Sequence, residues 1–152
     1  MVADVTRDGM YVTPKIDFLT EAGSLLSRPM KKGELVMAVS GNPGVCSILN
    51  VDACIHDGFA GFKNFDNNVV LIEYAYFILS KLGDFHSKQS ESAIFKNLKT
   101  DQLRNFEIPI PSIEEQQIIV SNLLNEKNTI NGAINLKAKM ELKIKAVIDK
   151  VW

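Results

Sequence analysis

The chain has 152 residues, of which 46% are hydrophobic and 23% charged, and its formal net charge is −1. This length allows one domain with its own core plus an appendage, and the near-zero charge excludes a globally basic nucleic-acid-binding protein. No apolar run reaches the ~18 residues of a membrane span, and Cys46 and Cys54 are too few for a disulfide framework, so we expect a cytoplasmic protein without a membrane partner.

The first third of the chain predicts short strands joined by tight turns. Its apolar runs are brief and are bounded by glycine, proline and asparagine, which is typical of a β-rich domain. The sequence Gly-Asn-Pro-Gly at residues 41–44 predicts a hairpin turn. The expected strands cover residues 11–14, 35–40, 45–51 and, with bends or bulges at its glycines in a curved sheet, 53–63.

The middle of the chain predicts helix, loop and edge strand in turn. Residues 70–85 carry apolar side chains at helical spacing, which predicts an amphipathic helix. Residues 86–95 are polar and serine-rich, which predicts a surface loop. We expect Thr100 to cap a short helical turn. Residues 106–110 should form an edge strand, because proline cannot donate to a ladder.

The junction at residues 108–120 is the most informative stretch. Pro109 and Pro111 disfavour helix for the residues that precede them, which predicts an extended connector. Ser112 lies three residues before Glu115, the spacing of a capping box, so a helix should begin there. The junction therefore predicts a stiff arm between a mixed domain and a helix.

Residues 112–152 predict one long helix of the coiled-coil type, after a domain over residues 1–111. Apolar residues recur at two heptad positions, one of which includes Gln116. A helix this long cannot bury its apolar stripe on so small a domain, so it needs a second helix from another copy or from a partner. The alternative is a break near Gly132, where poor helix formers cluster. The expected helix interface consists of Val120, Leu123, Ile130, Ile134, Ile144 and Ile148.

No catalytic, cofactor or metal site is predicted. Asp52, His56 and Asp57 lie close in sequence, but their spacing fits no metal-ligand motif, and a strand end with surface side chains is the favoured interpretation. The turn at residues 41–44 lacks both the Lys-Ser/Thr of a phosphate loop and the aromatic residue of an adenine-methyltransferase motif. The residues alone therefore indicate an α+β interaction protein.

A family resemblance adds to this interpretation. The run from Ile108 through Glu115, Gln116 and Ile119 resembles the I-P-x-P-x-x-x-E-Q-x-x-I sequence that ends a target-recognition domain in specificity subunits of type I restriction–modification systems. The likeness covers nearly the whole chain. It includes an early I-T-P-like turn at 11–15, a G-D-x-L-like strand at 32–37, an S-G-x-x-G hairpin at 40–44 and an N-L segment at 92–98.

The resemblance implies a curved, β-rich recognition domain followed by a spacer helix. Only ten residues precede the I-T-P-like turn, where the family has several dozen, so the domain is expected to be shortened at its N-terminus. One domain and one helix correspond to half of a specificity subunit, which could form a homodimer through its helix. Such a subunit is non-catalytic, and methyltransferase subunits, with restriction subunits indirectly, supply the chemistry.

The expected partner is double-stranded DNA, recognised at one half of a bipartite site. Residues 60–64 fall where the family varies, and the predicted loop at 86–95 carries groups that can contact phosphates or base edges. The alternative function is a helical-dimer adaptor without DNA specificity. The candidate DNA contacts are Lys63, Asn64, Lys88, Gln89, Ser90 and Ser92.

Overall fold

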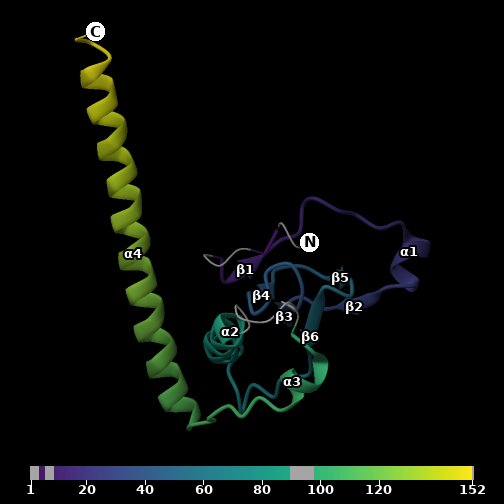
Figure 1. Cartoon of the computed structure of the whole chain (residues 1–152). Coiled ribbons are helices and arrows are strands. Elements are labelled where there is room, and N and C mark those ends of the chain that lie inside the picture. The colour runs from purple at the N-terminus through teal and green to yellow at the C-terminus, as the bar shows by residue number, and fades with distance from the viewer. Residues whose placement is uncertain (1–3, 6–8, 90–97, 152) are drawn as a thin grey trace. The chain divides into compact units, whose positions relative to one another are not determined.

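The computed structural model describes residues 4–5, 9–89 and 98–151, without the side chains of residues 86–89. The chain forms two compact units, Met1–Gln116 and Gln117–Trp152. Figure 1 shows the elements along the chain. In order they are β1 (Tyr11–Val12), α1 (Glu21–Leu25), β2 (Arg28–Met30), β3 (Leu35–Ala38), β4 (Cys46–Leu49), β5 (Ala53–Ile55), β6 (Phe59–Phe62), α2 (Ile72–Gln89), α3 (Thr100–Arg104) and α4 (Ile113–Ile148).

A four-stranded sheet with the order β1-β4-β3-β6 forms the centre of the first unit. The strand β3 pairs antiparallel with both β4 and β6, and β1 adds parallel to β4. All residues of β3 and β4 are buried. Strands buried on both faces consist of continuous apolar runs, which is why residues 35–40 and 45–51 were recognisable as strands.

The two faces of this sheet pack against different elements. One face packs against α2, which contacts β4, and the buried Cys46 thiol of β4 donates to the Gly44 carbonyl (3.6 Å). The opposite face packs against the second, two-stranded sheet of β2 and β5. The buried apolar cluster that includes this second sheet consists of Val5, Val12, Met30, Val36, Ala38, Val45, Leu49, Ile55 and Phe59.

The stretch predicted as one bent strand, residues 53–63, divides into two strands. Phe59 N–H donates to the His56 carbonyl (3.0 Å) in the turn between them, so β5 pairs with β2 while β6 pairs with β3. The α1–β2 region was not predicted at all. Helix α1 buries none of its five residues and depends on the Thr20 side chain as N-cap, and β2 contains a proline, so neither has a strong sequence pattern.

The predicted helix at 70–85 is confirmed, but it ends later than expected. Helix α2 continues through Gln89, so residues 86–89 are helical where a loop was predicted. Lysine and glutamine are good helix formers, so polarity alone did not indicate a loop. The remainder of that predicted loop, residues 90–97, lies outside the described residues. Lys99, not Thr100, is the N-cap of α3, and its backbone N–H donates to Gln102 Oε1 (2.9 Å).

The predicted edge strand at 106–110 is wrong, because this segment has no regular secondary structure and pairs with no strand among the described residues. Helix α4 follows it as one element of 36 residues, and it continues without interruption past Gly132, where a break was the alternative. In the part of the chain that the structure describes, no helix is both long and apolar enough to cross a membrane.

Candidate nucleic-acid interface and helix junction

Two predicted DNA contacts, Lys63 and Asn64, lie directly after β6. The Lys63 ammonium donates a hydrogen bond to the Pro29 carbonyl of β2, which links the end of β6 to the second sheet. Asn64 is exposed and has a left-handed backbone conformation (φ 58°). Asparagine tolerates this conformation better than most residues. The pair therefore presents one tethered cation and one free amide at the surface.

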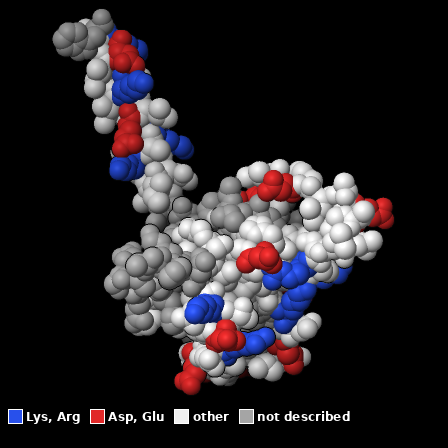
Figure 2. Space-filling view, turned by 45° about the vertical axis from the view of Figure 1, so that its right-hand side comes forward, with Lys and Arg blue, Asp and Glu red and all other residues white. Residues whose placement is uncertain are grey.

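Further cationic side chains surround Lys63 in β2 and in the turn after it. Arg28 pairs with Asp57 (3.2 Å), and Lys31 pairs with Asp52 (2.8 Å). Figure 2 shows Lys and Arg side chains gathered on one face of the molecule with Asp and Glu side chains at their borders. Sequence reasoning missed this group because β2 was not predicted. We call Arg28, Lys31 and Lys63 the β2 cationic group.

Lys31 and Asp52 shift each other's pKa at this surface. The hydrogen bond from Lys31 lowers the pKa of Asp52, with the backbone N–H of Lys32 as a second donor (2.9 Å). In turn, the hydrogen bond to Asp52 raises the pKa of Lys31. Both groups are fully exposed, and exposed pairs contribute little to stability. The pair therefore leaves Lys31 charged and exposed at this surface.

The other predicted DNA contacts belong to the segment at the end of α2. The structure places Lys88 and Gln89 in the last turn of this helix, and their side chains are not described. Ser90 and Ser92 lie outside the described residues. These four residues stay predictions, and only Lys63 and Asn64 are placed together.

The Asp52, His56 and Asp57 set does not form a joint site. Asp52 and Asp57 bind different cations, and His56 Nδ1 accepts the Gly58 backbone N–H (2.9 Å). Among residues 4–5, 9–89 and 98–151, no group of three His, Cys, Asp or Glu side chains could hold a metal ion. Each of the three side chains therefore makes its own local contact.

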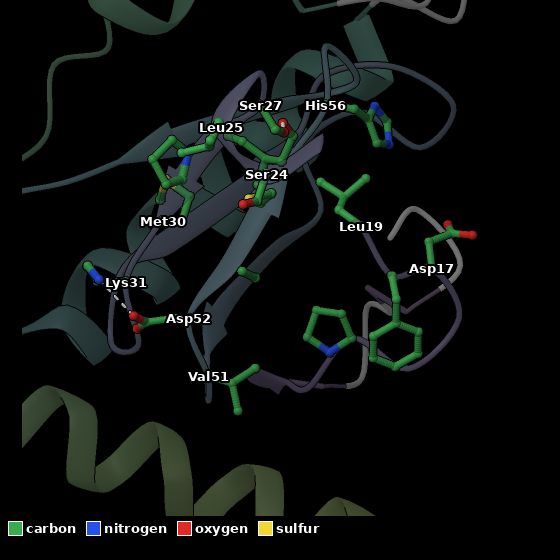
Figure 3. Close-up of a pocket in the computed structure, with 16 residues that line it drawn as sticks. Asp17, Leu19, Ser24, Leu25, Ser27, Met30, Lys31, Val51, Asp52 and His56 are labelled. Carbon is green, nitrogen blue, oxygen red and sulfur yellow. Dashed lines mark hydrogen bonds and ion pairs between the residues drawn. The ribbon is translucent and has the colours of Figure 1, made fainter. Parts of the chain in front are cut away.

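An apolar cavity of about 690 Å³ lies between residues 14–19, α1, β2 and β5. Figure 3 shows Leu19, Leu25 and Val51 around it and the Lys31–Asp52 pair at one end. Cys54 also lines the cavity and is half-buried. The other cysteine, Cys46, is buried beneath α2, and burial raises the pKa of its thiol to about 12, so it is protonated at neutral pH.

The junction before α4 contains the capping box expected from the sequence. The Ser112 backbone N–H donates to Glu115 Oε2 (3.0 Å), and the Glu115 N–H donates to Ser112 Oγ (3.3 Å). These reciprocal bonds satisfy two donors that the first helical turn leaves without partners. The start of the helix is thus fixed by local chemistry.

Gln116, which heptad spacing places at a seam position of the helix, is completely buried in the first unit. Its Nε2 donates to the carbonyls of Val69 (2.8 Å) and Pro111 (2.9 Å), and its Oε1 accepts the N–H of Leu71 (2.9 Å). We call these three hydrogen bonds the Gln116 anchor. The sequence signal for it was a lone amide at an apolar position, but spacing could not say what it contacts.

A second link joins the same elements. Tyr74, in the first turn of α2, is almost fully buried and donates its hydroxyl hydrogen bond to the Pro109 carbonyl (3.0 Å). The Pro109 carbonyl is therefore held directly by α2, and the Pro111 carbonyl is held by Gln116, which also bonds to the residues just before α2. Both oxygens accept bonds from side chains, and no strand pairing is needed.

The predicted helix interface remains exposed in this single chain. Its members Leu123, Ile130, Ile134, Ile144 and Ile148 are 39% to 59% exposed, and Val120 is half-buried. Isolated exposed apolar residues are common, but a contiguous apolar stripe marks an interaction site. We call the six residues, Val120 included, the α4 stripe.

The sequence of this chain matches a known protein family, and its fold is similar to that of solved structures. Residues 24–142 match the model of the type I restriction modification DNA specificity domain. The matched range begins in α1 and includes strands β2 to β6, the junction and most of α4, whereas β1 lies before it.

Two solved structures share the fold. One comes from work on complex assembly and conformational transition of the type I R-M system, with a TM-score of 0.76 and 22% identity over 95% of this chain. The other is the HsdS subunit from Thermoanaerobacter tengcongensis, with a TM-score of 0.65 and 22% identity over 86% of this chain. The chain spans 34% and 29% of the length of these two structures.

Proposed function

Because this chain belongs to the type I restriction modification DNA specificity domain family, we propose that it is a sequence-specific, non-catalytic DNA-recognition subunit of a type I restriction–modification complex. The observation that carries this proposal is the extent of the family match, which includes the first unit from residue 24, the junction and most of the long helix. Domain and helix are thus expected to act together.

In this proposal the domain binds the major groove of one half of a bipartite site. Lys63 and Asn64 stand exposed after β6, and the side chains of lysine and asparagine match guanine and adenine edges respectively. Arg28 and Lys31 are suited to phosphates, because both are exposed cationic side chains. Lys88, Gln89, Ser90 and Ser92 remain proposed contacts at the end of α2 and beyond it.

The partners in this proposal supply what the chain lacks. A net charge of −1 provides little general attraction to DNA, so methyltransferase subunits would supply most phosphate contacts together with cofactor and chemistry. Restriction subunits would join the complex through them, and a cytoplasmic location stays a prediction.

The α4 stripe is proposed to bury against a second helix, in the simplest case that of another copy of this chain. Its apolar residues follow a heptad pattern, which is typical of helix pairs in coiled coils. Two chains paired in this way would present two recognition domains, one for each half-site. The alternative function, a helical adaptor without DNA specificity, is favoured only by the net charge of −2 over residues 1–112.

The test is methylome sequencing of cells with and without this gene, combined with copurification of the chain and a methyltransferase subunit from the same genome. We expect the two proteins to copurify and a bipartite methylated motif to disappear when the gene is deleted. Copurification with an unchanged methylome would favour the adaptor. Failure of both would reject the recognition subunit.

A further inference from the structure

Helix α1 ends in two leucines that are almost fully exposed. Leu25 is 83% and Leu26 is 93% exposed, and the helix buries none of its five residues. Figure 1 shows α1 at the edge of the first unit, beyond β2 and β5. One exposed leucine would need no explanation, but Phe18, which lines the same cavity as Leu25, is also 83% exposed. An apolar surface of this kind marks a contact site for another molecule.

The two leucines differ in their surroundings. Residues four positions apart share a face of an α-helix, so Leu25 shares its face with the carboxylate of Glu21, and Leu26 shares its face with Ala22. Leu25 also belongs to the lining of the apolar cavity, whereas Leu26 does not among the described residues. Leu26 is therefore an apolar group at the surface without an acidic neighbour on its own helix face.

The backbone that carries Leu26 is fixed by hydrogen bonds. The Leu26 N–H donates to the Gly23 carbonyl (3.2 Å), and the Ser27 N–H donates to the Ser24 carbonyl (3.2 Å). The Ser27 hydroxyl also donates to the Ile55 carbonyl of β5 (3.3 Å). A side chain on an ordered backbone loses less conformational freedom when it binds. Leu26 is therefore held ready for contact before its partner arrives.

The β2 cationic group lies directly after Leu26 in the chain. Arg28 follows two residues later, so the two Cα atoms are at most about 7 Å apart, and Lys63 bonds to the carbonyl between Arg28 and Lys31 in β2. Lysine is depleted in protein–protein interfaces. Double-stranded DNA, in contrast, offers phosphates for cations and thymine methyl groups for apolar side chains. An exposed leucine among cations therefore fits DNA better than a protein partner.

We propose that Leu26 is a specificity-determining residue that contacts the 5-methyl group of a thymine in the major groove. A helix of five residues is about 7.5 Å long, and the major groove is about 12 Å wide and admits an α-helix. Arg28 then binds a neighbouring phosphate. The inference rests on the proposed function, and it adds an apolar contact to the polar contacts of Lys63 and Asn64. It requires an A·T pair in the half-site.

The test removes the methyl group from the DNA and leaves the base pairing unchanged. The full chain is reconstituted with its methyltransferase subunits, and its site is obtained by selection from randomised duplexes. Each thymine of the site is then replaced, one at a time, by deoxyuridine, which lacks the 5-methyl group. At one position of the half-site we expect the dissociation constant to rise about fourfold, as for the loss of one buried methyl group.

Two alanine variants identify the residue that makes this contact. Leu26→Ala should weaken binding to the thymine duplex by about fourfold, and it should bind the deoxyuridine duplex equally well, because each change removes the same contact. Leu25→Ala is the matched control, since it changes the adjacent exposed leucine. It should keep the fourfold difference between the two duplexes. Circular dichroism checks that both variants are folded.

The outcomes separate this inference from the proposed function. If the wild-type complex enriches no half-site sequence, the proposed function fails and the inference with it. If the enriched half-site has no A·T pair, if deoxyuridine has no effect at any position, or if its effect is undiminished in folded Leu26→Ala, only the inference is overturned. Loss of copurification with the methyltransferase subunit in both alanine variants, with no deoxyuridine effect in the wild type, would assign this surface to a protein partner instead.

Discussion

Two glycines, Gly44 and Gly83, let the hairpin turn and helix α2 approach each other closely. A Cβ added at Gly83 would lie 2.5 Å from Gly44 Cα, and one added at Gly44 would lie 2.5 Å from the Gly83 carbonyl carbon. Gly44 also has a left-handed backbone (φ 90°), which side chains other than glycine rarely adopt. The contact fixes α2 against the sheet, and with it the segment that carries Lys88 and Gln89.

We expect Gly83→Ala to destabilise the first unit by about 1–3 kcal/mol, because the new methyl group meets backbone atoms that cannot move independently. The matched control is Gly132→Ala in α4, where an added Cβ has no neighbour within 4 Å. There alanine should stabilise the helix by up to about 1 kcal/mol through its higher helix propensity. Urea unfolding followed by circular dichroism measures both, and equal effects at the two positions would contradict the packing argument.

Gln116 shows what a sequence pattern misses at the level of one residue. Heptad spacing placed it at a seam position of the helix, yet the structure buries it against backbone groups 45 and 47 positions earlier in the chain. The groups that Gln116 contacts depend on how α2 packs, and residue spacing carries no information about that packing. The capping box of Ser112 and Glu115, in contrast, was predictable because all its partners lie within four residues.

Among the elements, those with strong local patterns were predictable. The strands β3 and β4, the turn at 41–44, and the helices α2 and α4 follow from apolar periodicity and turn residues. The failures were elements that depend on tertiary partners. The strands β5 and β6 separate because they pair with different partners, β2 and β3. Residues 106–110 form no strand with the described residues, and the Pro109 carbonyl accepts the hydroxyl hydrogen bond of Tyr74.

The candidate nucleic-acid interface was also only partly predictable from the sequence. Lys63 and Asn64 were predicted from their place in the resemblance, and the structure shows them exposed after β6. Arg28 and Lys31 were missed, because nothing in the sequence indicates that β2 lies beside the end of β6. Proximity between distant segments is therefore the part of the site that only the structure supplied.

The exposed α4 stripe leads to a prediction about association. Leu123→Asp places a charge at a position expected to be buried between two helices, so it should convert a dimer into a monomer. Leu142→Asp is the control, because Leu142 is 69% exposed, belongs to the same helix and is not a member of the α4 stripe. Light scattering of both variants gives the mass directly.

If Leu123→Asp leaves the mass of a dimer unchanged, the α4 stripe is not the contact between copies. If the wild type is already a monomer, its second helix must come from a different protein. Dissociation by Leu142→Asp as well would show that helix surface charge, and not the α4 stripe, governs association.

At the scale of the whole molecule, the chain combines a weakly charged recognition domain with a helix that exposes an apolar stripe. A net charge of −1 means that general attraction to DNA is small. Sequence preference would then depend on base-edge contacts and on the phosphate contacts of partner subunits. The chain spans 34% and 29% of the two solved structures that share its fold, so assembly with further polypeptide is part of the proposal.

The most direct measurement of the central claim is equilibrium binding by the wild-type chain reconstituted with methyltransferase subunits. Two duplexes of equal composition are compared, one with the bipartite site found by selection and one with a half-site shuffled. Ionic strength is held constant, because phosphate contacts make affinity strongly salt-dependent. A DNA-recognition subunit predicts a dissociation constant at least about 10³-fold lower for the intact site, whereas equal dissociation constants for the two duplexes would contradict it.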